Sequence, residues 1–292
     1  MLTNSAANTG CGKRYRLRRQ RTQTSVPAGR FFVWAGLFLC VFLPGPSTGA
    51  GARPDQAACH TNDYDEKAVV KHVIDGDTVI LTDNRHIRLI GINTPEIAHD
   101  VRPAQPGADQ AYRYLSSLLH TQKTIYLHYD RQRLDRYKRT LAHLFLGDGT
   151  NVQALLLDRG LATTLPMPPN LEFLDCYETS SATAQNHRIG LWALKQYQPT
   201  PVELITRKDL GYRIVTGKIT RVAEDESAAW IILANNLSLR IANENLHYFG
   251  NLQGLAGSQI RVRGLLYFSN GEFRMHIRHP TDMKIMATAG GD

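Results

Sequence analysis

The sequence predicts an α+β fold in which a small five-stranded barrel with three helices is followed by a second, all-β barrel. Three observations predict it. Residues 68–146 contain short runs rich in β-branched residues, separated by turn residues, as in antiparallel strands. Three other segments carry the apolar spacing or the end signals of helices. The last third of the chain again has strand-like runs, and 292 residues suffice for two domains of roughly 100 to 200 residues each.

The first barrel is expected to begin with two strands joined at Asp75-Gly76-Asp77, because β-branched runs flank this turn sequence. A polar turn at 82–85 leads into the third strand, and the glycine-containing turn 147–149 follows the last one. The sequence therefore predicts a meander of short antiparallel strands that continues beyond a helix. The expected strands are 68–74, 78–81, 86–90, 124–129 and 140–146.

Three helices are expected around these strands. Ala111, Leu115 and Leu118 have the spacing of one helical face. Asn151 is a suitable N-cap for the next helix, and Gly160 is expected as its C-cap. The expected helices are 108–120, 152–159 and a third within 171–187.

The last third has its own organisation. Pro199-Thr200-Pro201 reads as a stiff break, because proline fixes φ and lacks an N–H donor. Residues 243–255 occupy the place of a connecting helix or loop. We therefore expect domains at 60–198 and 205–287. The expected strands of the second domain are 213–222, 229–233, 237–241, 258–266 and 272–277.

Residues 1–52 read as an N-terminal leader. They hold seven basic and no acidic residues, and leaving them out takes the formal charge from +8 to +1. Net charge is therefore no argument for nucleic-acid binding. The apolar run 31–43 precedes small residues at 50–52, the pattern of a cleaved signal peptide. We expect a secreted or periplasmic protein; the alternative is an uncleaved anchor that holds the domains outside the cytoplasm.

Two cysteines lie beyond the leader. In an oxidising compartment Cys59 and Cys176 are candidates for a disulfide that would close a loop of more than a hundred residues. Such a bond would contribute roughly 4 to 5 kcal/mol in the chain-entropy treatment. Two unpaired thiols are the alternative.

Three motifs of the first domain carry chemistry. They are Asp75-Gly76-Asp77-Thr78, the segment 88–96 (RLIGINTPE) and the segment 135–139 (DRYKR). Together they supply oxygen ligands for a divalent cation, a carboxylate to activate water, and cations where negative charge develops, which is what phosphodiester hydrolysis needs. Each motif alone has an ordinary interpretation: aspartates serve turns, a strand arginine snorkels, and a basic turn is solvated. Only the joint pattern predicts a nuclease.

With Asn151–Ala162 (NVQALLLDRGLA), these motifs occur in the order and spacing of the staphylococcal (thermonuclease) family. The region from about residue 68 to 192 resembles that family, whose pattern combines D-G-D-T, R-L-x-x-x-D-T-P-E, D-x-Y-G-R and N-x-x-L-x-x-x-G-x-A. The resemblance implies a small barrel of the OB type and a divalent-metal-dependent nuclease acting on DNA or RNA. The sequence points to no protein partner.

The resemblance also implies a role for each matching residue. Asp77 would ligate calcium, or another divalent cation, with its carboxylate and Thr94 with its backbone carbonyl, while Asn93 stands where the family has a second aspartate. Glu96 would orient or deprotonate the attacking water. These are hard oxygen groups, which suit calcium.

The cations of the matching motifs would handle phosphates. Arg88 and Arg139 would bind the scissile phosphate and offset the charge that grows on it. Arg136 and Tyr137 fall where the family contacts a neighbouring terminal phosphate.

Two residues depart from the family pattern. Asn93 removes one negative charge from the metal ligands, which is expected to weaken cation binding or shift the choice of ion. Lys138 replaces a glycine in a turn that favours positive φ, at a cost of order 1 kcal/mol, and this change could displace Arg139. The alternative function is therefore a catalytically weakened nucleic-acid-binding module that keeps the nuclease fold.

The strand set of the second domain resembles an OB-fold barrel. Such barrels often bind single-stranded nucleic acid through a basic groove with stacking aromatics. A packing module that only stabilises the first domain is an equal alternative. The candidate contact residues are Arg261, Arg263, Arg274, Arg278, Tyr267 and Phe268.

Overall fold

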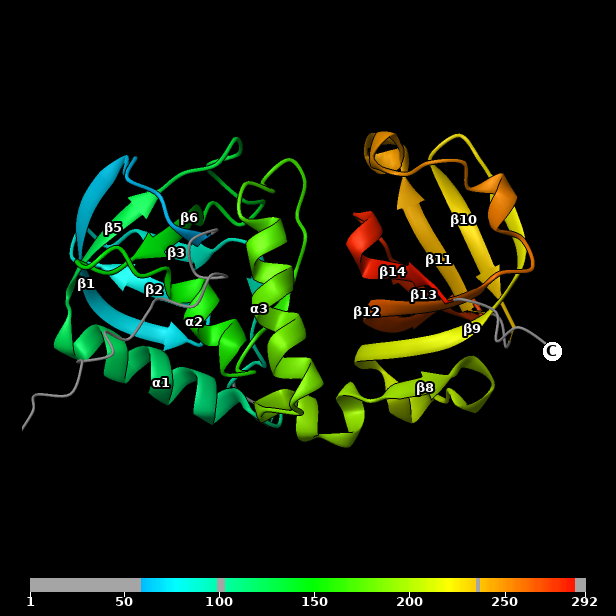
Figure 1. Ribbon diagram of the computed structural model, residues 1–292, viewed down its shortest axis with the longest axis horizontal. Coiled ribbons are helices and arrows are strands. Elements are labelled where there is room, and N and C mark those ends of the chain that lie inside the picture. Colours follow the sequence, from blue (N-terminus) through cyan, green and yellow to red (C-terminus); the bar gives the residue numbers. More distant parts are fainter. Residues whose placement is uncertain (1–58, 99–102, 235–236, 287–292) are drawn as a thin grey trace, which may run out of the picture. The chain divides into compact units, whose positions relative to one another are not determined.

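The computed structural model describes residues 59–98, 103–234 and 237–286. In the first half, five strands form a closed barrel in the order β1-β2-β3-β6-β5 (Figure 1). All neighbours pair antiparallel except β3 and β6, which run parallel. The barrel strands are β1 (Glu66–Asp75), β2 (Thr78–Leu81), β3 (His86–Leu89), β5 (Thr124–His128) and β6 (Thr140–Phe145).

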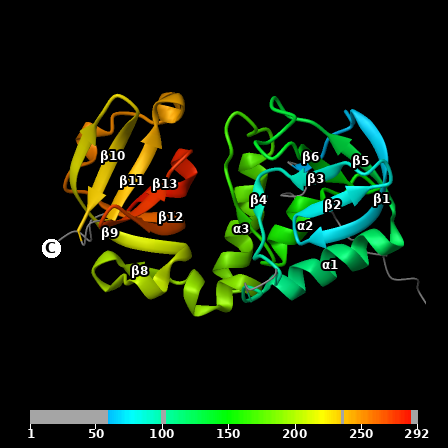
Figure 2. The ribbon, with the colours of Figure 1, turned by 180° about the vertical axis from the view of Figure 1, so that it is seen from behind.

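Three α-helices accompany this barrel, as predicted. They are α1 (Ala108–Thr121), α2 (Val152–Asp158) and α3 (Leu174–Asn186). Helix α1 packs against β1, and α2 contacts both β6 and α3; Figure 2 shows α1 alongside β1 and β2 from behind. A separate two-stranded ladder joins β4 (Ile92–Asn93) to β7 (Thr163–Thr164).

The ends of α2 follow from the sequence with one correction. The side chain of Asn151 accepts a hydrogen bond from the backbone N–H of Ala154 and caps the helix as predicted. The C-cap is Arg159, and the predicted cap Gly160 is the next residue, with φ +60°. A glycine in this left-handed conformation just after the C-cap is the usual way to end a helix.

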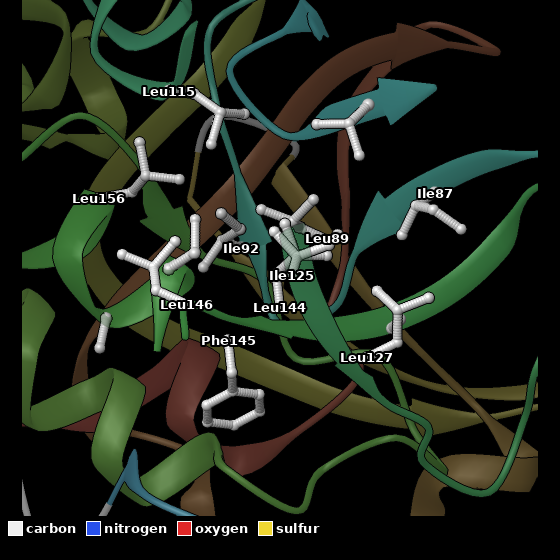
Figure 3. Packing of buried hydrophobic residues seen from close by; sticks show 14 of the residues in the cluster. Ile87, Leu89, Ile92, Leu115, Ile125, Leu127, Leu144, Phe145, Leu146 and Leu156 are labelled. Carbon is white, nitrogen blue, oxygen red and sulfur yellow. The ribbon is translucent and has the colours of Figure 1, made fainter. Parts of the chain in front are cut away.

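The interior of the first barrel is filled by aliphatic side chains from every strand. Figure 3 shows Leu89, Ile125 and Leu144, from three different strands, directed toward one another. All three are at most 1% exposed. Because the barrel has no room for a ligand inside, any substrate must be handled at its ends or outer surface.

The second half is all β, in agreement with the predicted fold class. Its sheet has the order β14-β12-β13-β11-β10-β9-β8, and β12 also pairs with β9. Five of these strands, β9-β10-β11-β13-β12, therefore return to their starting strand. The strands are β8 (Pro199–Pro201), β9 (Gly211–Glu224), β10 (Ala228–Leu233), β11 (Leu237–Ala242), β12 (Gln259–Ser269), β13 (Glu272–His276) and β14 (Met283–Ile285).

The expected break at Pro199-Thr200-Pro201 is wrong. These residues form β8, which pairs parallel with β9 at Ile214, Val215 and Thr216. Proline is tolerated here because β8 is the edge strand of the sheet, where a missing N–H donor costs little. The expected connection at 243–255 contains two short 3-10 helices, Asn243–Tyr248 and Gln253–Leu255.

The apolar residues gather in two large clusters and a small one. The large clusters draw their buried members from residues 59–177 and 202–277. The small cluster contains Trp192 and Tyr197 together with Ile214 of β9. The domain limits 60–198 and 205–287 stay a prediction.

A disulfide joins Cys59, just before β1, to Cys176 of α3, with the two Cα atoms 5.5 Å apart. Within the described ranges, no helix combines the length and the apolar character needed to cross a bilayer. The predicted leader, residues 1–52, lies outside these ranges.

Candidate active site

The turn between β1 and β2 carries the first candidate residues. The side chain of Asp75 accepts a hydrogen bond from the backbone N–H of Asp77 (3.0 Å) and so fixes the turn. A Cβ atom at Gly76 would lie 2.8 Å from Thr94 and 2.6 Å from the Cβ of Ala111. Only glycine therefore allows this turn to approach the segment that contains Thr94.

Asp77 holds that segment in place. Its carboxylate is buried, and Oδ2 accepts hydrogen bonds from the backbone N–H (2.8 Å) and the hydroxyl (3.2 Å) of Thr94. Oδ1 accepts a bond from the hydroxyl of Thr78 (3.1 Å). The predicted ligands Asp77 and Thr94, seventeen residues apart in sequence, thus lie side by side.

Arg88 joins the same group from β3. Its Nη2 lies 3.1 Å from Oδ2 of Asp77 and donates to the side-chain oxygen of Asn93 (3.2 Å) and to the carbonyl of Ile92 (2.9 Å). The side chain is only 11% exposed, so it does not snorkel to solvent. Its Nε–H donates no hydrogen bond within the described part of the chain and stays available as a donor.

Asn93 is bonded at both ends of its amide. Oδ1 accepts from Arg88, while Nδ2 donates to the carbonyl oxygen of Thr94 (3.1 Å). That carbonyl is one of the predicted metal ligands. The amide hydrogen therefore occupies one of its lone pairs, an interaction that the aspartate of the family pattern could not make.

The two turn carboxylates affect each other. Burial, together with the negative charge of Asp77, raises the pKa of Asp75 to about 6. Two carboxylates, an amide oxygen and a backbone carbonyl form a set of hard oxygen donors that fits calcium or magnesium. Among the described residues there is no cluster of three or more His, Cys, Asp or Glu side chains suited to a metal, so two carboxylates are the acidic part of this set.

Glu96 lies two residues beyond Thr94 on an exposed loop. Its backbone is held by Gln105, whose side chain accepts from the N–H of Glu96 (3.2 Å) and whose N–H donates to the carbonyl of Glu96 (2.9 Å). Within the described residues its carboxylate contacts none of the groups around Asp77. The loop leaves this carboxylate open to water.

Residues 135–139 form a tight turn organised by Asp135. Its Oδ1 accepts from the backbone N–H groups of Tyr137 and Arg139, and Oδ2 accepts from Nε of Arg139 (2.7 Å). Burial opposes ionisation, but these bonds outweigh it and hold the pKa of Asp135 below its usual value. Lys138 adopts φ +64°, so the turn keeps a left-handed residue where the family has glycine.

The side chain of Arg139 is thus held in one orientation by Asp135 of its own turn, and it is half-buried. It lies just before β6, whose first residue pairs with Ile87, the neighbour of Arg88. Tyr137 is 64% exposed, with the guanidinium groups of Arg136 and Arg139 over its ring at 4.8 and 5.6 Å. These contacts give the turn an aromatic surface between two cations.

Two positioning residues were missed by sequence reasoning. Asp135 was read only as the first letter of a motif, although an aspartate two residues before a backbone N–H is a known turn former. Gln105 carries no local signal, because its contact with Glu96 depends on the path of the loop.

Oxygen ligands for a divalent cation with an arginine beside them are groups that phosphodiester-hydrolysing enzymes use. A family model described as staphylococcal nuclease homologue matches residues 86–194. That range includes Arg88, Glu96 and Arg139, whereas Asp77 precedes it.

Individual relatives indicate the same family. The chain is 37% identical to a thermonuclease of Staphylococcus intermedius over 131 residues, which cover 44% of this chain and 76% of the relative. It is 33% identical to a thermonuclease of Staphylococcus hyicus over 143 residues, 48% of this chain and 83% of the relative. A probable endonuclease, lcl3, of Talaromyces marneffei is 36% identical over 121 residues, 37% of this chain and 34% of the relative. The chain belongs to the staphylococcal nuclease family, as predicted.

Proposed function

We propose that this nuclease of the staphylococcal family cleaves DNA, RNA or both with a divalent cation, calcium by expectation, held at the turn of Asp75 and Asp77. The observation that carries the proposal is the arrangement around Asp77. The Asp77 carboxylate bonds to the Thr94 backbone and pairs with Arg88, while the Asn93 amide bonds to both Arg88 and Thr94, which closes a ring of four groups.

The ligands of the cation would be Asp77, the Thr94 carbonyl and the Asn93 side-chain oxygen, with Asp75 close by. When bound, such a cation neutralises charge on a phosphoryl oxygen. The cation would use the second lone pair of the Thr94 carbonyl, because the Nδ2–H of Asn93 bonds to the first.

The remaining roles fall to side chains outside the cation ligands. Glu96, whose carboxylate is exposed, accepts a proton from the attacking water. Arg88 and Arg139 donate hydrogen bonds to the phosphate as negative charge grows on it. Arg136 and Tyr137, on the exposed tip of the turn, contact a neighbouring phosphate.

One observation favours a second function. Arg88 is already bonded to Asp77 and Asn93, and Asn93 lacks the family's negative charge. Both features suit a site that binds nucleic acid with weak metal affinity and little hydrolysis. This is the catalytically weakened module.

Cleavage assays separate the two functions. The purified protein would be incubated with single-stranded DNA, duplex DNA and RNA, in calcium, in magnesium and in excess chelator. We expect cleavage that chelator stops and that Arg88→Ala abolishes. The matched control is Arg113→Ala, which removes an arginine that is 79% exposed on α1. If a folded protein cuts no substrate in any ion, the weakened module is the correct function.

Export is a separate part of the proposal. It is supported by the basic and apolar leader and by the disulfide, which suits an oxidising compartment. N-terminal sequencing of the protein recovered from outside the cytoplasm should find a chain that starts near Arg53. A chain that keeps residues 1–52 in the membrane fraction would instead establish the anchor.

A further inference from the structure

The outer surface of the second barrel carries five polar or aromatic side chains on adjacent strands. Strand register places Trp230 opposite Arg240, Arg240 opposite His276, and Tyr267 opposite Arg274. Partners in register point to the same side of a sheet. We call this surface the arginine face; it consists of Trp230, Arg240, Tyr267, Arg274 and His276.

The alternate residues of the same strands point inward. Ile231, Leu239 and Met275 are completely buried in the apolar cluster of this barrel. A barrel of five strands is filled by such side chains. Any ligand of this barrel must therefore bind on its outside, where the arginine face lies.

The side chains of the face are held in defined orientations. The guanidinium of Arg274 lies 5.2 Å from the centre of the Trp230 ring, and its Nε donates to Glu272 (2.7 Å). The indole N–H of Trp230 donates to Asp225 (2.6 Å). The hydroxyl of Tyr267 and Nε2 of His276 are hydrogen-bonded at 2.5 Å. Such preorganisation lowers the entropy lost when a ligand binds.

The face has an excess of positive charge. Burial lowers the pKa of His276, and the charges of Arg278, Arg240 and Arg274 lower it further. His276 is therefore neutral at pH 7, with three permanent cations around it. Two carboxylates, Glu272 bonded to Arg274 and Asp225 bonded to the Trp230 indole, offset two of these three charges and leave one in excess. The local field favours an anion.

We propose that the arginine face binds single-stranded nucleic acid, with Trp230 and Tyr267 stacking on bases and Arg240 and Arg274 contacting phosphates. An acidic peptide would satisfy the charges but not the aromatic rings. A duplex would hide its base faces, whereas a single strand offers both groups at once. The choice of ligand rests on the proposed nuclease function, but binding here requires no cleavage.

The structure corrects the residues expected from sequence. Arg263 is largely buried and pairs with Glu178 and Asp282. Phe268 packs against Phe273 and lies beneath the guanidinium of Arg207. The arginine face keeps Arg274 and Tyr267 from the residues expected from sequence. It adds Trp230, Arg240 and His276.

The test is binding of a fluorescent twelve-nucleotide oligo(dT) to the full chain in excess chelator, followed by anisotropy. Trp230→Ala should weaken binding by about 5- to 150-fold, the range for the loss of one stacked base. The double variant Arg240→Ala, Arg274→Ala should reduce the slope of log K against log salt by about 1.4, or 0.7 for each lost phosphate contact. Arg113→Ala is the matched control, because it removes an arginine that is 79% exposed on α1, beside the first barrel, and it should change neither value.

Unchanged affinity and salt slope in both variants would overturn the proposal. So would equal competition by duplex DNA or poly-aspartate, because either would show charge attraction without stacking. If Trp230→Ala unfolds at a lower temperature than the unchanged protein, two other variants test the proposal. They are Trp230→Phe, which should keep the affinity, and the double arginine variant. Failure of hydrolysis leaves these results intact, since all binding is measured in chelator.

Cleavage gives a second readout that separates the two sites. Arginine-face variants should raise KM for a thirty-nucleotide strand without changing kcat. They should leave cleavage of a trinucleotide unaffected, because an OB-type barrel contacts about 4 to 16 nucleotides and so short a substrate has none to spare beyond the cleavage site. An equal loss for both substrates would mean that the face acts only by supporting the fold.

Discussion

The two barrels share one strand order but carry different side chains at the same places. The first runs β1-β2-β3-β6-β5, and the second runs β9-β10-β11-β13-β12. In each, the parallel pair is formed by the third and fifth strands along the chain, β3 with β6 and β11 with β13. The strand that closes the ring pairs with the first strand in both. The backbone therefore does not explain why the proposed chemistry lies in the first barrel alone.

The difference lies in side chains at matching positions. The first residue of β2 pairs with Arg88, whereas the first residue of β10 pairs with Ala242. In the first hairpin, Asp77 is buried and bonds to Thr94, far along the chain. The residue in the same place before β10 is Ser227, which is exposed and bonds within its own turn to Asp225. These bonds lower the pKa of Asp225 to about 2. A shared fold thus implies no shared function.

The sharpest test of this contrast is Glu96→Ser. Loss of a general base typically reduces the rate 10²- to 10⁴-fold, and the exposed side chain should leave folding intact. The control is Glu244→Ser, an exposed glutamate in the connection after β11 of the second barrel, which should keep the full rate. Single-turnover cleavage of a labelled strand measures both. A Glu96→Ser protein with normal kcat would remove the chemistry from this loop.

The stabilising effect of the disulfide should be confined to the first barrel. The disulfide encloses a separation of 117 residues in the first half of the chain, and no cysteine follows Cys176. Cys176→Ser should lower the free energy of unfolding of the first barrel by about 4 to 5 kcal/mol. Hydrogen exchange resolved by segment should show the loss in β1–β6 and none in β9–β13. Equal loss in both would mean that the two barrels unfold as one unit.

The sequence predicted most of the fold because its local signals agree with the tertiary structure. The run at 78–81 became β2 with the same limits, and Asn151 caps α2. Strand β8 was missed because two prolines argue against a strand wherever its edge position is unknown.

The site was predicted in part for the same reason. Motif spacing named Asp77, Arg88 and Thr94, which the structure brings together. The Asn93 bond to Thr94 depends on side-chain rotamers and leaves no trace in spacing. In the second barrel, Arg263 and Arg274 are equally basic in the sequence, but packing buries the first and places the second on the arginine face. A list of basic residues cannot make that distinction.

Asn93→Asp tests whether the missing charge limits cation binding in the first barrel. A unit charge about 4 Å from a divalent cation gains about 2 kcal/mol even in water, so calcium binding should tighten by at least about tenfold. Part of this gain is offset because the new carboxylate also attracts Arg88. Calorimetric titration without substrate measures it, with Asn251→Asp in the second barrel as control. An unchanged titration would remove residue 93 from the metal ligands.

The smallest effect is expected where each barrel places a non-glycine residue at positive φ. Lys138 has φ +64° in the first and Asn270 has φ +52° in the second. A left-handed lysine costs about 1 to 2 kcal/mol, and glycine would return about 0.5 to 1 kcal/mol of that as lost chain entropy. Lys138→Gly should therefore raise the free energy of unfolding by less than about 1 kcal/mol. Asn270→Gly should bring no gain, because asparagine tolerates this conformation. Urea unfolding with a constant m-value measures both variants.

The cleavage rate of Lys138→Gly should not change, because Asp135 holds the backbone N–H and Nε of Arg139 whatever residue precedes it. A faster Lys138→Gly enzyme would show that lysine in this turn displaces Arg139 from the position that cleavage needs.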